Sequence, residues 1–181
     1  TASPWLVKAL AIGAVVLLTI VNAFGAAWMG RSETLIVAIK LAILILFAGV
    51  GLFFVNADNL SVAAWPGVES ILFGAGVLFI GYEGFGLVTN AAADMDNPRT
   101  MLPRALYTSV ILVIIIYLAV SVTVTGNLTN DQIAAAKDYA LAEAAKPFVG
   151  QFGFRLIAIA ALFSTASAIN ATLFGSANVC Y

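Results

Sequence analysis

The chain has 181 residues, of which 62% are hydrophobic and 9% are charged, and its formal net charge is −1. Soluble domains carry about 45–50% apolar and about 25% charged residues, so this composition excludes a water-soluble domain and indicates a multi-pass integral protein of the cell membrane. The near-zero charge, the absence of histidine and the single cysteine leave no basic surface for nucleic acid and no catalytic triad or metal-ligand set, so we expect no enzyme, no metal and no cofactor.

Five apolar segments are long enough to form helices that cross a bilayer, which takes about 20 residues each. They cover about residues 5–28, 34–55, 68–93, 102–125 and 154–181. We expect a short turn at residues 30–33, with Ser32 capping the second segment. Lys40 lies inside that segment, and two interpretations stay open: it reaches back to the membrane interface, or it is held inside the protein as a proton carrier.

The third segment contains the sequence FIGYEGFG at residues 79–86, and five glycines lie between positions 74 and 86. A carboxylate is costly in lipid, so Glu83 should face a polar cavity and mark a functional site. One interpretation is a helix broken near residues 81–86, whose first half ends in free carbonyls that bind an ammonium group or small cation. The other is a continuous helix that packs through its glycine face, with Glu83 paired structurally.

A charged turn at residues 94–99 leads into the fourth segment, and Pro103 suits the first turn of that helix. Thr129-Asn-Asp-Gln132 has the pattern of a capping box and opens a short polar helix at about residues 130–146, which Pro147 should end. The last segment carries many Ser, Thr and Asn side chains, which mostly bond to their own backbone or join helices. Ser164 and Ser167 are three residues apart and share a face, which leaves room for a small polar site.

The distribution of lysine and arginine gives a weak indication of orientation. Arg31, Arg99 and Arg104 lie on one side of the expected spans, and this side is favoured as cytoplasmic because the charges opposite belong partly to a long loop. The chain starts almost directly on an apolar segment and ends inside one. We therefore expect it to be a piece of a longer protein.

Two motifs at this spacing resemble a known family. FIGYEGFG, followed by DMDNPRTMLPRA at residues 94–105, resembles the sixth helix and following loop of amino acid permeases of the amino acid–polyamine–organocation (APC) superfamily. VAIKLAILILFAGVGLFF at residues 37–54 resembles the fifth helix, where proton-coupled members have a lysine at the position of Lys40. The five segments then correspond to helices four to eight of twelve, part of a fold of two five-helix inverted repeats with one broken helix in this chain.

The resemblance implies roles for individual residues. Lys40 would occupy the place of a sodium ion in sodium-coupled relatives, faced by Ser164 and Ser167, and Glu83 would contribute to proton coupling without a direct salt bridge to Lys40. The substrate ammonium group would be lined by Phe79, Ile80, Gly81, Tyr82 and Glu83. Gly84 and Gly86 depart from the larger residues that many members have there, which leaves the side-chain specificity open.

We predict secondary active transport of amino acids, coupled to protons or working by exchange, with sodium as the other possible coupling ion. The partners would be the amino acid, the lipid bilayer and the remaining helices of the longer protein. Two other functions stay open. One is a cation channel or ion-translocating subunit that uses Glu83 and Lys40 as a relay, and the other is a membrane interaction protein that transports nothing.

Overall fold

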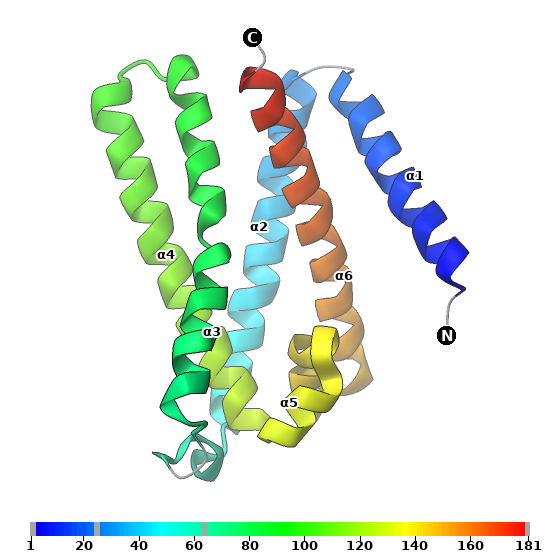
Figure 1. Cartoon of the computed structure of the whole chain (residues 1–181), viewed down its shortest axis with the longest axis vertical. Helices are drawn as coiled ribbons and strands as arrows, with labels where there is room; N and C mark the ends of the chain where they lie inside the picture. Colours follow the sequence, from blue (N-terminus) through cyan, green and yellow to red (C-terminus); the bar gives the residue numbers. More distant parts are fainter. Residues whose placement is uncertain (1–2, 24–25, 63–64, 180–181) are drawn as a thin grey trace. The chain divides into compact units, whose positions relative to one another are not determined.

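The computed structural model describes residues 3–23, 26–62 and 65–179, and within these ranges the chain is helical and contains no strand (Figure 1). The α-helices are α1 (Pro4–Ala23), α2 (Ala26–Gly51), α3 (Val68–Ile80), α4 (Pro98–Asn127), α5 (Asn130–Ala136) and α6 (Ala140–Val179). The 3₁₀ segments are η1 (Leu52–Phe54), η2 (Ala57–Leu60), η4 (Glu83–Asp94) and η5 (Lys137–Tyr139).

The chain folds as two compact units. The first comprises Thr1–Leu41 and Ile159–Tyr181, and so holds α1, the start of α2 and the end of α6. The second comprises Ala42–Ala158 and holds the remaining elements. The polar site described below lies entirely in the first unit, and the main apolar cluster lies entirely in the second.

Four helical stretches in the described part of the chain are long and apolar enough to cross a membrane. They are Glu33–Phe54, Val68–Gly86, Pro98–Asn127 and Asn130–Leu173, and a shorter apolar helix covers Lys8–Leu17. Isolated backbone groups cannot be satisfied in lipid, and a helix pairs them within its own segment. The chain is therefore an all-α, multi-pass membrane protein.

The expected turn at residues 30–33 is wrong, because these residues are helical within α2, which already begins at Ala26. Gly30 is the only helix-weakening residue there, and one glycine costs about 1 kcal/mol relative to alanine, too little to end a helix that continues on both sides. Ser32 therefore lies inside α2 and not at an N-cap position. This shift matters for function because it places Glu33 on the same helix as Lys40.

The short polar helix expected at about residues 130–146 begins where it was predicted, but it ends differently. Thr129 Oγ1 accepts from Gln132 N at 3.4 Å and Gln132 Oε1 accepts from Thr129 N at 2.9 Å, which completes the capping box. The segment then divides into α5, η5 and the start of α6. Pro147 lies inside α6 and does not end it; the backbone turns instead at Gly150, whose φ of 66° suits glycine far better than other residues.

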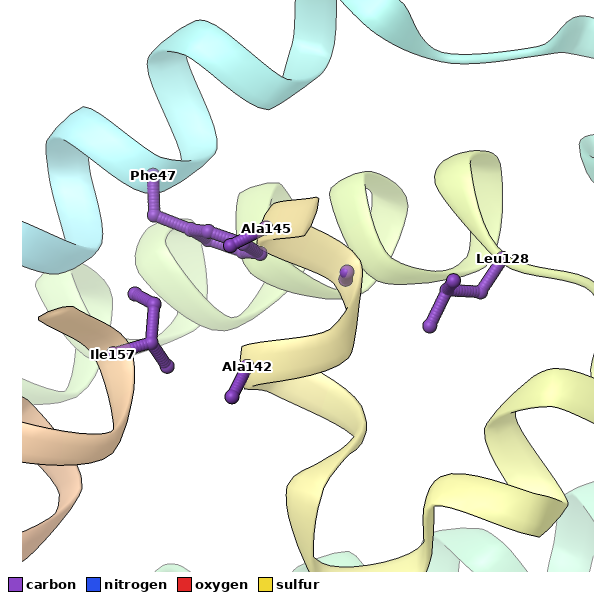
Figure 2. Packing of buried hydrophobic residues seen from close by; sticks show 6 residues of the cluster. Phe47, Leu128, Ala142, Ala145 and Ile157 are labelled. Carbon is purple, nitrogen blue, oxygen red and sulfur yellow. The ribbon is translucent and has the colours of Figure 1, made fainter. Parts of the chain in front are cut away.

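Six buried side chains form the apolar cluster of the second unit. They are Phe47, Leu128, Ala142, Ala144, Ala145 and Ile157 (Figure 2). Phe148 lies beside this cluster, with its ring centroid 5.6 Å from that of Phe47 and 5.8 Å from that of Phe54. An apolar cavity of about 200 Å³ adjoins the same residues.

The ends of α2 and α4 are joined by hydrogen bonds across 76 residues of sequence. Asn127 Nδ2 donates to Gly51 O at 3.0 Å and to Thr123 O at 2.8 Å. In return, Gly126 O accepts from Asn56 N at 2.9 Å and from Asn59 Nδ2 at 3.2 Å. The carbonyls at a helix end lack partners within the helix, so these amides satisfy them where water is scarce.

Asn127→Ala should lower the thermal stability of the protein, because it removes the side-chain amide that joins the end of α4 to Gly51 O at the end of α2. A hydrogen bond of this kind contributes about 0.5–1.5 kcal/mol, so we expect a fall in the midpoint of thermal unfolding in detergent. Gln151→Ala is the matched control, since it removes an exposed amide of α6. An unchanged midpoint for Asn127→Ala would show that the join is not stabilising.

Candidate functional site

Lys40 of α2 is held by a serine of α6 inside the first unit. The Lys40 side chain is half-buried, and its Nζ donates to Ser167 Oγ at 2.9 Å. Ser167 is only 5% exposed. Lys40 is therefore fixed within the protein at a defined partner, which disfavours the interpretation that it simply reaches back to the membrane interface.

A carboxylate lies on the other side of the same serine. Ser167 Oγ donates a hydrogen bond to Glu33 Oε1, and Asn170 Nδ2 donates to Glu33 Oε2 at 3.1 Å. Glu33 and Lys40 are seven residues apart on α2, two helical turns, so both face α6. We call Glu33, Lys40, Ser167 and Asn170 the polar cluster.

The polar cluster has a consistent arrangement of donors. The Ser167 hydroxyl has one hydrogen, which it gives to Glu33, while its lone pair accepts from the Lys40 ammonium group. The cation and the anion offset one another through this hydroxyl. Burying charges is costly unless they are paired and hydrogen-bonded, so a cluster built this way fits a functional site better than an accidental contact.

The sequence pointed to part of this cluster only. The structure brings Ser167 to Lys40, whereas the side chain of Ser164 is exposed in α6. Glu33 was missed because it was assigned to the expected turn at residues 30–33. Asn170 was missed because it is one of many polar residues in the last span. The spacings could have found them: Glu33 and Lys40 share a helix face, and so do Ser167 and Asn170.

The third span changes its backbone at the glycine-rich motif. The α-helix α3 ends at Ile80, and the next two bonds are of the tighter i to i−3 type, from Gly81 N to Leu78 O at 2.9 Å and from Tyr82 N to Phe79 O at 3.0 Å. A 3₁₀ helix follows from Glu83 to Asp94. The span is therefore not a continuous α-helix. A 3₁₀ run of 12 residues is unusually long, and 3₁₀ geometry in the course of a helix often marks a functional hinge or a sequence under strain.

Four of the five glycines of this span have no packing neighbour among the described residues. Nothing in the described structure lies within 4 Å of a Cβ added at Gly74, Gly76, Gly84 or Gly86. A close-packed glycine face, the alternative to a break, would bring neighbouring atoms within this distance. The backbone at these four glycines is therefore open in the described structure.

The residues predicted to bind substrate lie at the change of backbone. Phe79 and Ile80 are 79% and 66% exposed, while Tyr82 is half-buried. The ring of Tyr82 stacks on Phe85 at 5.7 Å and meets Tyr117 of α4 edge-on at 5.8 Å. The contact between Tyr82 and Tyr117 holds the motif against α4. The side chain of Glu83 lies outside the part that the structure describes, so its burial and partners stay predictions.

Apolar spanning helices, a spanning segment that changes backbone at a glycine-rich motif and a charged cluster on one pair of helices define an all-α, multi-pass membrane protein. A family model described as amino acid permease matches residues 1–181. The chain belongs to the amino acid permease family, which is a family of transporters and not of enzymes.

Three curated relatives illustrate the range of the family. Uncharacterized protein MJ0609 of Methanocaldococcus jannaschii is 43% identical over 94% of this chain, Inner membrane transport protein YbaT of Escherichia coli is 31% identical over 93%, and Methylthioribose transporter of Bacillus subtilis is 26% identical over 92%. The chain spans only 39%, 39% and 36% of these relatives' lengths.

Proposed function

We propose that this chain is the central part of a secondary active transporter that carries amino acids and couples their movement to protons. Membership of the amino acid permease family supports the substrate class. The observation that supports proton coupling is the hydrogen bond from Lys40 Nζ to Ser167 Oγ. Because Ser167 is neutral, it can hold the lysine within the span both when the lysine carries the extra proton and when it has lost it.

The substrate would bind where the third span changes from α to 3₁₀. The backbone of Phe79, Ile80, Gly81 and Tyr82, with Glu83 beside it, would receive the ammonium group, because the end of a helix carries partial negative charge. Ser164 stays a proposed neighbour of the coupling site through its place on α6. The remaining helices of the longer protein would complete the site.

Uptake by the full-length protein in proteoliposomes tests this function. Radiolabelled amino acids should accumulate against their gradient when the outside is made acidic, and a sodium gradient alone should not drive them. Unlabelled methylthioribose serves as a competitor, because one relative is named for that substrate. Ion current without substrate would favour a cation channel, amino acid exchange without net proton movement would favour an exchanger, and no flux would favour an interaction protein.

Glu83→Gln should keep substrate binding and flatten the pH dependence of transport, since glutamine resembles the protonated acid and cannot lose a proton. The measurement is the initial rate of uptake as a function of pH, beside substrate binding to the purified variant. Glu69→Gln, at the exposed start of α3, is the control. An unaltered pH profile for Glu83→Gln would remove Glu83 from the coupling mechanism.

A further inference from the structure

We infer that Glu33 is a second proton station of this transporter, reached from Lys40 through the hydroxyl of Ser167. The inference rests on the proposed proton coupling and adds to it an acceptor, a relay and an orientation. It follows from the order of three groups in the polar cluster: an ammonium donor, a hydroxyl that both accepts and donates, and a carboxylate acceptor.

The geometry suits a relay through two hydrogen bonds. Lys40 Nζ lies 2.9 Å from Ser167 Oγ, and Ser167 Oγ is hydrogen-bonded directly to Glu33 Oε1. Ser167 is buried, so bulk water does not compete at the hydroxyl. Asn170 holds the second carboxylate oxygen at 3.1 Å, which leaves Oε1 aimed at the serine. Asn170 is thus a positioning residue.

The transfer balances in atoms and charge. One N–H bond of the Lys40 ammonium group breaks as its proton joins Ser167 Oγ, while the original O–H bond of Ser167 breaks and its proton joins Glu33 Oε1. The products are a neutral amine, an intact serine hydroxyl and a carboxylic acid. The serine then donates to the amine nitrogen, so the reverse transfer is equally possible.

In the described part of the first unit, few other charges can influence this relay. From α6, residues 159–179 present Ser167 and Asn170 but no ionisable side chain. From α1 the only charged residue is Lys8, which is exposed and lies over the Trp5 ring at 5.5 Å from its centroid. Arg31 of α2 and the chain end at residues 180–181 have side chains outside the described structure. Among the described residues, Glu33 is the acidic side chain that the polar cluster links to Lys40.

The relay is also oriented along the axis of the span. Glu33 is the first residue of the apolar stretch Glu33–Phe54, whereas Lys40 lies seven residues farther in, about 10 Å at 1.5 Å per residue. A proton that moves from Lys40 to Glu33 therefore moves toward the end of the span. This is the end next to Arg31, which the arginine distribution favours as cytoplasmic.

The test compares variants of the full-length transporter in proteoliposomes. The readout is uptake driven by a pH gradient, divided by amino acid counterflow at equal pH, where no net proton has to move. Ser167→Ala and Glu33→Gln should each lower this ratio by about tenfold or more, because proton transfer through a positioned group is lost. Ser167→Thr, which keeps the hydroxyl, should retain most of the ratio. Thr172→Ala is the matched control, since it removes an exposed hydroxyl of α6 that donates to Ala168 O on the same helix.

The outcomes separate the inference from the proposed function. If the wild type shows no uptake driven by a pH gradient, the proposed function and this inference are both overturned. If the wild type is driven and Lys40→Ala is not, but Glu33→Gln keeps the wild-type ratio, the second station alone is overturned. A normal ratio in Ser167→Ala overturns the relay. If Glu33→Gln does not fold, as judged by its elution from a gel-filtration column, Glu33→Asp replaces it and should give an intermediate ratio. If Glu33→Asp instead keeps the full wild-type ratio, an infrared difference band for a protonated carboxyl decides: its presence supports Glu33 as a proton station, and its absence overturns that role.

Discussion

Lys40→Ala should abolish amino acid accumulation driven by a pH gradient while the protein still folds. The alanine variant removes the cation that Ser167 Oγ holds at 2.9 Å and leaves Glu33 with Ser167 and Asn170 as donors. A proton relay contributes about 10²–10⁴-fold where it is used, so the driven rate should fall to the background of empty liposomes. The measurement is radiolabelled uptake at a fixed inward proton gradient.

Two variants sharpen this result. Lys40→Gln keeps a hydrogen-bond donor for Ser167 but cannot titrate, so it should fail as fully as alanine if the proton matters and should be rescued if only the contact matters. Lys8→Ala removes an exposed lysine of α1 and should behave as the wild type. Full response of Lys40→Ala to the gradient would reduce Lys40 to an anchor.

Gly51→Ala should destabilise the protein strongly, although the change adds a single methyl group. A Cβ at Gly51 would lie 2.3 Å from Thr123 Cγ2 and 2.9 Å from Phe148 Cζ, and Thr123 is fully buried. Overpacking of this kind costs about 1–3 kcal/mol, and each kcal/mol lowers the unfolding midpoint by roughly 2–4 °C in a domain of this size. Thermal unfolding of the purified protein measures the shift.

Gly49→Ala is the matched control because it lies on the same helix with nothing within 4 Å of the added Cβ. Alanine favours a helix over glycine by about 0.5–1 kcal/mol, so this variant should be slightly more stable than the wild type. Thr123→Ser removes the clashing methyl group and keeps the hydroxyl that donates to Ala48 O at 3.4 Å. The double variant Gly51→Ala with Thr123→Ser should therefore lose less than the sum of the two; strict additivity would contradict the clash.

The membrane class followed from the sequence because a run of about twenty apolar residues is rare outside a membrane span. The boundary between the first two spans did not, because alanine, tryptophan and methionine beside Gly30 are compatible with either a turn or a helix. That error hid Glu33, whose partners come from residues 134 and 137 positions later. Contacts at such separation depend on how α2 and α6 pack, which no local pattern encodes.

The glycine-rich motif was more informative. Its glycines and carboxylate left two interpretations open, a break near residues 81–86 and a continuous helix packed through its glycines, and the backbone leaves α-helical geometry from Gly81 onward. The kind of change could not be predicted, because glycine permits many backbone conformations and the neighbours choose among them. Tyr117 of α4 is one such neighbour, and it lies 35 positions beyond Tyr82 in the sequence.

The long reach of the bonds made by α2 has a consequence for biosynthesis. Its last carbonyl, at Gly51, finds the Asn127 amide only after 76 more residues have been made, and the Glu33 carboxylate finds Ser167 only after 134. At about 5–20 residues per second, the ribosome takes several seconds to supply the first partner and longer for the second. During that interval the Glu33 carboxylate and the Gly51 carbonyl of the nascent helix lack these partners. This favours a helix that remains beside the insertion machinery over one that is released early into lipid.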